Sequence, residues 1–281
     1  KDFNLDNSRH HSDGDLKEYF EKEGVFVISQ VDTRSLVNYV RDKGAMNVLI
    51  SSDVKKIESL KEKLNKIPSM SGLELASFVS VSKSYSLGNP KSKYRVAVFD
   101  FGIKKNIIRS LEARGVYMKI FPFNTSSKEI MDWNPTGVFF SNGPGDPSAM
   151  KSVIKNINQI IEIKIPVFGI CLGHQLIALS SGLKTYKMHN GHRGINHPVF
   201  NMMTKKCEVT SQNHGFSIEE KSLKGKKNIK VTHRNLNDQT IEGISFIDRP
   251  CFSVQYHPES SQGPQDSRYL FDQFISNMDN V

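Results

Sequence analysis

Cysteine is scarce in this chain, which has three cysteines among 281 residues. They are Cys171, Cys207 and Cys251, an odd number at wide spacings. This pattern excludes the disulfide framework of a small secreted protein, because such frameworks need paired cysteines in a short chain. We therefore expect a reducing, cytoplasmic compartment, in which a thiol stays free for chemistry.

Long hydrophobic runs are also absent. No apolar stretch approaches the ~20 residues that a membrane helix needs. The first residues, from Lys1, lack the basic, apolar and small-residue regions of a signal peptide. Hydrophobic residues still make up 37% of the chain, which suffices for a packed core. We expect a large globular domain with a smaller one and no membrane partner.

Acidic residues are outnumbered, with 29 Asp and Glu against 38 Lys and Arg. Residues 184–234 hold eleven basic and three acidic residues, a net charge of +8. Nucleic-acid binding is one interpretation of such a segment. However, aromatic residues are not interleaved with these charges, and Gly225 and Asn228 favour a solvated turn. We expect no nucleic-acid partner, and an acidic partner protein is the remaining alternative.

Residues 1–81 predict a partial small α+β domain, and the polar residues 82–93 predict a linker. Asp32 is placed to cap a helix that ends at Gly44. The other expected elements are helices at Leu16–Glu23 and after Ser52-Asp53, and strands at Val25–Ile28 and Met46–Ile50. No metal site is predicted, since the pair His10-His11 lacks further ligands at a sensible spacing.

Residues 94–281 alternate between strand and helix patterns. Buried strands are expected at Arg95–Phe99, Tyr117–Phe123, Gly137–Phe140 and before Cys171, with helices between them. Such alternation predicts an α/β fold with a mostly parallel central sheet and helices on both faces. Past Gly182 the repeat of the apolar residues shortens from helical to strand-like spacing. Five strand-like segments predict an antiparallel extension of the sheet: Leu183–Met188, Cys207–Thr210, Ile229–His233, Thr240–Ile247 and Phe252–Tyr256.

Cys171 lies where an apolar strand gives way to a helix pattern. Gly169 and Gly173 flank it, and small neighbours are what a strained nucleophile turn needs. A helix amino terminus behind the sulfur favours the thiolate. The alternative is a buried structural cysteine, which is the commoner case for a cysteine beside a sheet.

His257 is the best candidate for a base, because a thiol nucleophile needs one. It follows an expected strand, and Pro258 and Glu259 come next. A His/Glu pair two residues apart can place the carboxylate near the imidazole, hold one tautomer and stabilise the imidazolium. The alternative is a strand-end histidine with an unrelated surface glutamate.

An oxyanion hole is expected beside Cys171. The backbone N–H of Leu172 is one donor by the geometry of such a turn, and the glycine-rich loop at Gly143 is the natural second. Residues 142–147 lack the Lys-Ser/Thr of a phosphate-binding loop, so an ATP site is not predicted.

The sequence resembles the class I, or triad, glutamine amidotransferases. The motifs are residues 141–147 (SNGPGDP), 169–175 (GICLGHQ) and 257–259 (HPE). More narrowly it is similar to the small, glutaminase subunits of carbamoyl phosphate synthetases, through residues 31–34 (VDTR), 100–106 (DFGIKKN), 191–198 (GHRGINHP) and 212–216 (QNHGF). The match spans nearly the whole chain, in order and at compatible spacing.

The resemblance implies a role for each matching residue. Cys171 attacks the side-chain amide of glutamine to form a γ-glutamyl thioester, His257 moves the protons and Glu259 orients His257. The residues implied to hold glutamine, two of them through the oxyanion hole, are Gly143, Gly145, Leu172, Gln175, Asn213, Gly215 and Phe216. Family members have a longer amino-terminal domain, which supplies a serine contact to glutamine. This chain matches only the later part of that domain.

The resemblance also implies a partner. The family passes ammonia through a shielded path to the large subunit or synthetase domain of carbamoyl phosphate synthetase, for pyrimidine or arginine biosynthesis. That component uses ATP, Mg²⁺ and bicarbonate, so no cofactor is expected in this chain.

Two other function classes stay open. One is another triad amidotransferase or a γ-glutamyl hydrolase, which does not carry the α+β unit of residues 1–81 in front of the glutaminase. The other is a non-catalytic module that regulates a synthetase through the basic residues 184–234.

Overall fold

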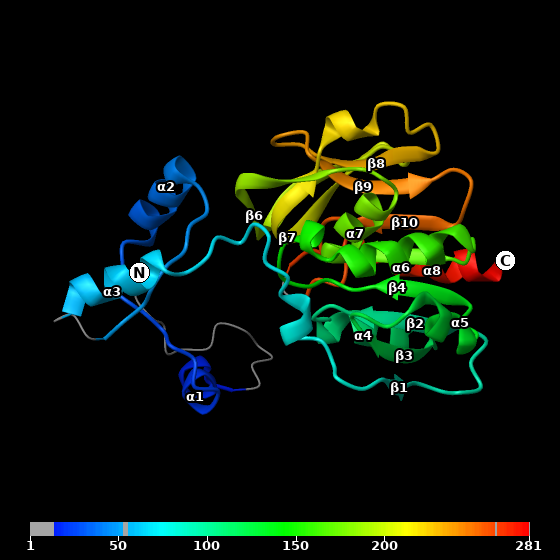
Figure 1. Cartoon of the computed structure of the whole chain (residues 1–281), viewed down its shortest axis with the longest axis horizontal. Coiled ribbons are helices and arrows are strands. Elements are labelled where there is room, and N and C mark those ends of the chain that lie inside the picture. The colour runs from blue at the N-terminus through cyan, green and yellow to red at the C-terminus, as the bar shows by residue number, and fades with distance from the viewer. Residues whose placement is uncertain (1–13, 53–55, 262, 281) are drawn as a thin grey trace. The chain divides into compact units, whose positions relative to one another are not determined.

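The computed structural model of the chain describes residues 14–52, 56–261 and 263–280 (Figure 1). It divides into two compact units, residues 1–46 and residues 47–281. The predicted pair His10-His11 and the predicted helix cap at Asp53 lie outside the described residues.

The first unit contains the helices α1 (Leu16–Lys22) and α2 (Thr33–Lys43). The predicted cap of α2 is confirmed, because an Asp32 carboxylate oxygen accepts a hydrogen bond from the backbone N–H of Ser35 at 3.0 Å. Gly44 ends the helix with a φ of 89°, which favours glycine. Neither helix has a buried residue, so the described part of this unit has no core of its own.

The predicted strands at residues 25–28 and 46–50 are wrong. Both segments are irregular, and Phe26 and Val48 are 89% and 68% exposed. A strand forms only when a neighbouring strand takes its backbone hydrogen bonds, and the described residues supply no such neighbour here. The apolar pattern of these two segments is typical of strands, but it does not identify a partner strand.

The larger unit is built on a ten-stranded sheet with the order β1-β3-β2-β4-β5-β10-β9-β8-β6-β7. Its strands are β1 (Tyr85–Leu87), β2 (Arg95–Asp100), β3 (Tyr117–Pro122), β4 (Gly137–Phe140), β5 (Val167–Ile170), β6 (Thr185–Asn201), β7 (Lys206–Ile218), β8 (Ile229–Asn235), β9 (Ile241–Phe246) and β10 (Cys251–Val254). β3, β2, β4, β5 and β10 run parallel, and the other neighbours pair antiparallel. The predicted fold class, a mostly parallel central sheet with an antiparallel extension, is confirmed.

The predicted location of the last strand needs a correction. Residues 252–256 were expected in the antiparallel extension, but β10 pairs parallel with β5 and antiparallel with β9. Sequence periodicity identifies a strand without naming its neighbour, so this position could not be derived from the pattern. The parallel pairing with β5 places the segment that follows β10 beside the turn that follows β5.

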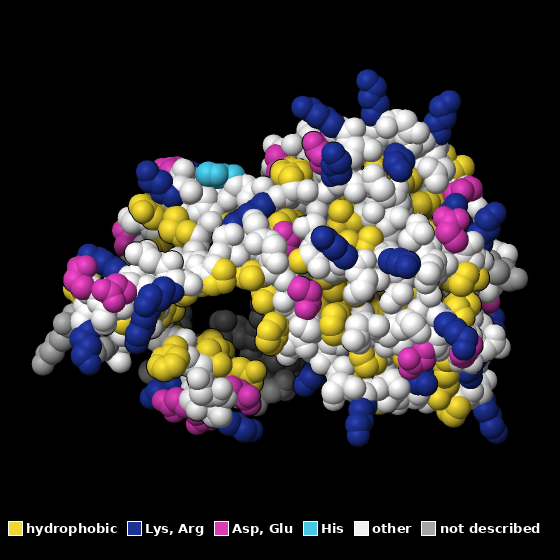
Figure 2. Space-filling view, in the orientation of Figure 1, with side chains coloured by type: hydrophobic (Ala, Val, Ile, Leu, Met, Phe, Trp, Pro, Cys, Tyr) yellow, Lys and Arg dark blue, Asp and Glu magenta, His cyan; other side chains and the backbone are white. Residues whose placement is uncertain are grey.

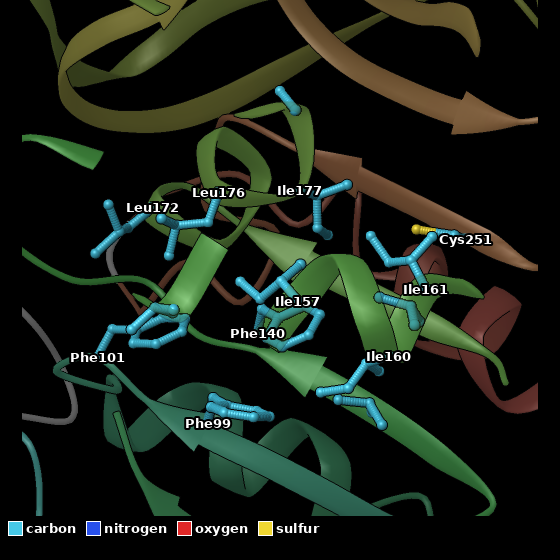
Figure 3. Packing of buried hydrophobic residues seen from close by; sticks show 14 of the residues in the cluster. Phe99, Phe101, Phe140, Ile157, Ile160, Ile161, Leu172, Leu176, Ile177 and Cys251 are labelled. Atoms are coloured by element: carbon cyan, nitrogen blue, oxygen red, sulfur yellow. The ribbon is translucent and has the colours of Figure 1, made fainter. Parts of the chain in front are cut away.

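Helices cover both faces of the parallel strands, as predicted (Figure 1). The helices of these two layers are α4 (Lys105–Glu112), α5 (Ser127–Asp132), α6 (Lys151–Glu162), α7 (Leu172–Ser180) and α8 (Tyr269–Asp279). The remaining α-helix described in this unit, α3 (Ile57–Asn65), has no buried residue. On one face, side chains of α6 and α7 pack with Phe99 and Phe140, as Figure 3 shows. On the other face, α4 and α8 pack with Val98, Phe139 and Phe168. Alternate residues of β2 thus face opposite layers.

The predicted linker at residues 82–93 contains the short strand β1, which pairs antiparallel with the edge strand β3. The division between the compact units falls at residue 46, before the predicted boundary at residue 81. The domain ranges 1–81 and 94–281 therefore stay predictions.

Part of the basic segment, residues 184–234, can be followed on the surface of the structure. Lys and Arg side chains project from the part of the larger unit that holds residues 219–230, next to β8 (Figures 1 and 2). Residues 220–223 form a short 3₁₀ helix there, and turns follow it. Within the described ranges, no helix combines the length and the apolar character needed to cross a bilayer.

Candidate active site

Cys171 lies on the turn between β5 and α7, as predicted. Its φ of 53° and ψ of −102° are strained for a residue with a side chain. Gly173 makes the turn possible, because a Cβ there would collide with the Phe140 backbone. A Cβ at Gly169 would likewise meet Gly173 and Ile177. The sulfur is thus presented by a tightly packed backbone, and Cys171 is 5% exposed.

The parallel pairing of β10 with β5 brings His257 to Cys171. Val254 pairs with Ile170, and the Cys171 N–H donates to the Val254 carbonyl at 2.9 Å. Three residues beyond the end of β10, His257 is anchored by its backbone N–H, which donates to the Ser211 carbonyl at 2.9 Å. Both side chains line one cavity.

Glu259 lies behind His257. His257 Nδ1 is 2.7 Å from Glu259 Oε1, and the glutamate is fully buried. Lys104 Nζ lies 2.9 Å from the same oxygen, and Asn106 donates to the Glu259 backbone carbonyl. The predicted catalytic residues are therefore in contact in one row, Cys171–His257–Glu259, and the ammonium group of Lys104 lies at its Glu259 end.

The charges in this row follow from its contacts. Burial would lower the pKa of His257, but the charge of Glu259 and hydrogen bonds with Cys171 and Glu259 raise it to about 10. Burial raises the pKa of Glu259, but His257 and Lys104 together hold it below its usual range. At neutral pH the pair is an imidazolium and a carboxylate, and the proton lies on the side chain next to the sulfur.

Gly143 and Leu172, the two predicted oxyanion-hole residues, lie next to each other at the turn that carries Cys171. Leu172 begins α7, and the first N–H groups of a helix have no partner within it. A Cβ at Gly143 would meet the Phe101 carbonyl and Leu172, so only glycine fits this approach. Asn142 fixes the loop, since its side chain donates to Gly102 at 3.0 Å and accepts from the Lys104 N–H at 3.1 Å.

The cavity has a volume of about 570 Å³. Eight of the ten predicted site residues line it: Gly143, Gly145, Cys171, Gln175, Asn213, Gly215, Phe216 and His257. Leu172 and Glu259 contact this set from behind. Gln175 Nε2 donates to the Phe216 carbonyl at 2.9 Å and to Gln255 at 3.0 Å, so it fixes the wall formed by β7.

Other lining residues were missed by the sequence reasoning. Lys104 and Arg193 both line the cavity, although the motifs at residues 100–106 and 191–198 predict no role for either side chain. Met70 and Val79 also line it, and Glu74 forms an isolated bridge with Gly145. Residues 70–79 fall within the predicted amino-terminal domain, and no periodic signal in them points to the cavity.

Among the residues that the structure describes, one group of three side chains could hold a metal ion. It consists of the buried residues His192, His214 and Glu242. The sequence reasoning assigned no metal ligands, because these residues lie 22 and 28 positions apart on different strands. Only the folded sheet brings them together.

Comparison with known proteins identifies two family matches in this chain. Residues 97–277 match the class-I glutamine amidotransferase family, and residues 1–50 match the carbamoyl-phosphate synthase small chain, CPSase domain. The fold also resembles a putative GMP synthase component from Thermoplasma acidophilum, at 24% identity and a TM-score of 0.59, covering 66% of this chain and 94% of that one. At that identity the likeness concerns the fold alone.

Sequence relatives cover nearly the whole chain. The carbamoyl phosphate synthase small chain of Chlorobaculum tepidum is 45% identical over 276 residues, which are 98% of this chain and 75% of that protein. The protein of the same name from Escherichia coli strain K12 is 41% identical over 291 residues, covering 98% of this chain and 76% of that one. This chain therefore belongs to the carbamoyl phosphate synthase small chain family and carries its class-I glutamine amidotransferase domain.

Proposed function

We propose that this chain hydrolyses glutamine to glutamate and ammonia and delivers the ammonia to a carbamoyl phosphate synthetase large subunit or synthetase domain. One observation carries the proposal: β10 pairs parallel with β5, so that Cys171 and His257 meet at one cavity of the family's glutaminase domain, with Glu259 behind His257. Relatives named as small chains support the existence of a larger synthetase partner.

The first half of the reaction forms a thioester. With its thiol proton held by His257, Cys171 Sγ attacks the side-chain carbonyl carbon of glutamine, and the carbonyl oxygen takes the negative charge toward the N–H groups of Gly143 and Leu172. When the C–N bond breaks, His257 gives its proton to the nitrogen and ammonia leaves. Glu259 stabilises the imidazolium before this transfer and Lys104 keeps Glu259 ionised.

The second half returns the enzyme to its starting state. Water gives a proton to His257 and its oxygen attacks the thioester carbon. The C–S bond then breaks, and glutamate leaves while the sulfur returns to its initial state beside the imidazolium. Gln175, Gly145, Asn213, Gly215 and Phe216 are proposed to hold the glutamine, because all five line the cavity around Cys171.

No cofactor takes part in this hydrolysis in our proposal. ATP, Mg²⁺ and bicarbonate act at the synthetase, and carbamoyl phosphate then serves pyrimidine or arginine synthesis. Ammonia is protected by transfer through a shielded path, since protonation in water would remove its nucleophilicity. We place the protein in the cytoplasm, where the free thiol of Cys171 stays reduced.

The other two function classes are less well supported. A different triad amidotransferase or a γ-glutamyl hydrolase does not account for the match of residues 1–50 to the carbamoyl-phosphate synthase small chain. A non-catalytic module does not account for the intact row of Cys171, His257 and Glu259.

The test is ammonia release from glutamine by the chain alone and with a synthetase large subunit, each beside its Cys171→Ser variant. We expect release that depends on Cys171, with or without stimulation by the large subunit. Ammonia from neither preparation would contradict the proposal, and so would binding of the large subunit without any hydrolysis.

A further inference from the structure

Three buried side chains converge in the wall of the cavity that β7 forms, and one of them, His214, lines the cavity. His192 on β6 pairs across the sheet with His214 on β7, and Glu242 comes from β9. They are 7%, 5% and 0% exposed. His192 Nδ1 lies 3.2 Å from His214 Nε2 and 3.1 Å from Glu242 Oε1, and all three atoms lie within 4.8 Å of one another.

The outer nitrogens of both imidazoles are already engaged. His214 Nδ1 is 2.8 Å from the Phe216 carbonyl, which can only accept, so this nitrogen carries hydrogen. His192 Nε2 is 2.9 Å from an Asp238 carboxylate oxygen, so it carries hydrogen as well. If both rings are neutral, the two nitrogens that face each other, Nδ1 of His192 and Nε2 of His214, carry no hydrogen and each presents a lone pair.

Hydrogen-bond acceptors outnumber hydrogen-bond donors where His192, His214 and Glu242 meet. Asn235 Nδ2 donates to Glu242 Oε1 at 3.1 Å and lies 3.4 Å from His192 Nδ1. His214 Nε2 is left facing His192 Nδ1 and, at 3.1 Å, the oxygen of Gln212. The second carboxylate oxygen of Glu242 is buried without a hydrogen-bond partner. A buried group of acceptors of this kind needs a cation or added protons.

The spacing and the charges fit a metal ion. Tetrahedral ligands about 2.0–2.1 Å from zinc lie roughly 3.3 Å from one another, close to the two short separations within the cluster. Zinc-bound histidines usually donate their other N–H to a carboxylate or a backbone carbonyl, as His192 and His214 do here. A divalent ion would also balance the two carboxylates, Glu242 and Asp238, beside neutral imidazoles.

We propose that His192 Nδ1, His214 Nε2 and Glu242 Oε1 bind one divalent transition-metal ion, with Zn²⁺ as its representative. The ion holds β6, β7 and β9 together in the wall of the cavity and fixes the segment that carries Asn213 and Gly215. Its role is structural, because the ligands are separate from the Cys171 row. The proposal does not rest on the proposed glutamine hydrolysis, since it concerns binding of the ion alone.

The test must exclude binding of the metal at Cys171 and His257, which are also possible ligands. We would therefore use the full chain with Cys171→Ser, strip it with a chelator, and add Zn²⁺ or Co²⁺. Bound zinc is measured by mass spectrometry of the element, and coordination by the visible absorption of Co²⁺. We expect one ion per chain and the intense absorption of a four-coordinate site.

Three variants in that background locate the site. Glu242→Gln keeps the shape but removes the charged ligand, and should weaken Zn²⁺ binding at least about 100-fold. Asp238→Asn removes only the support of His192, and should weaken it about 10–100-fold. His189→Gln, at an exposed histidine outside the cluster, is the matched control and should leave binding unchanged.

Two results would overturn the proposal. One is a parent protein that binds neither ion, which would mean that protons alone satisfy the cluster. The other is a folded Glu242→Gln variant that binds Zn²⁺ as tightly as the parent. If Glu242→Gln does not fold, the stoichiometry and the Co²⁺ spectrum of the parent and of His192→Gln decide the question.

Discussion

The parallel and antiparallel halves of the sheet contribute differently to the cavity. Gly143, Cys171 and His257 follow the ends of the parallel strands β4, β5 and β10, and close backbone contacts hold Gly143 and the Cys171 turn. The antiparallel strand β7 supplies Asn213 and Gly215 as a wall. The reacting groups thus lie at the carboxyl ends of parallel strands, where α/β proteins place their chemistry. The extension shapes the space in front of them.

If this division is correct, the largest loss of activity follows from His257→Gln on the parallel side. Without the imidazolium, the leaving nitrogen has no proton donor and the thioester has no base. We expect kcat for ammonia release to fall about 10²–10⁴-fold, measured by steady-state kinetics. His189→Gln, an exposed histidine outside the cavity, should leave kcat unchanged. Equal losses in both variants would point to misfolding.

Gly143→Ala tests the tight backbone packing of the parallel side. The added Cβ would collide with the Phe101 carbonyl and Leu172. We expect the free energy of unfolding to fall by about 1–3 kcal/mol in denaturant titrations, together with a lower kcat, because the loop must move. Unchanged stability and rate would show that this loop is not held as tightly as described.

Gly215→Ala is the matched change on the antiparallel side. A Cβ there has space, with Arg193 as its nearest neighbour at 3.6 Å. Stability should therefore stay the same, while the methyl group occupies part of the cavity and raises KM for glutamine roughly tenfold. A fall in kcat without a change in KM would contradict the role of this strand as a wall.

Lys104→Met removes the cation beside Glu259. The lysine is partly exposed, so solvent weakens its ion pair with the buried carboxylate. We expect kcat to fall about threefold to tenfold, because Glu259 then orients and stabilises the imidazolium less well. Lys105→Met is the control, since Lys105 is an exposed neighbour that does not line the cavity. A similar loss in both would assign the effect to the helix instead.

The stability of the chain should also depend on pH through His257. The pKa of His257 is about 10 in the folded chain and about 6.5 when unfolded, so its contribution is complete below pH 6.5 and disappears as the pH rises through 10. The difference in unfolding free energy between the wild type and His257→Gln should therefore shrink from pH 7 to pH 10. A constant difference across this range in denaturant titrations would show that His257 is not held protonated.

The sequence predicted the parallel side better than the rest. Alternation and turn residues are local signals, and they located Cys171 between its strand and its helix. The position of β10 depends on which distant strand it pairs with, and periodicity carries no such information. Likewise, the apolar runs at residues 25–28 and 46–50 predicted strands that the described structure does not form. Lys104 was missed for the same reason, since its partner Glu259 is distant in sequence.

The most direct test of the central claim is to trap the covalent intermediate. The chain, with its large subunit if that is needed for turnover, is mixed with glutamine, quenched in acid and measured by intact mass and peptide mapping. The account predicts a γ-glutamyl adduct on the peptide that contains Cys171, absent from Cys171→Ser. Undiminished ammonia release by Cys171→Ser, or an adduct on another residue, would contradict it.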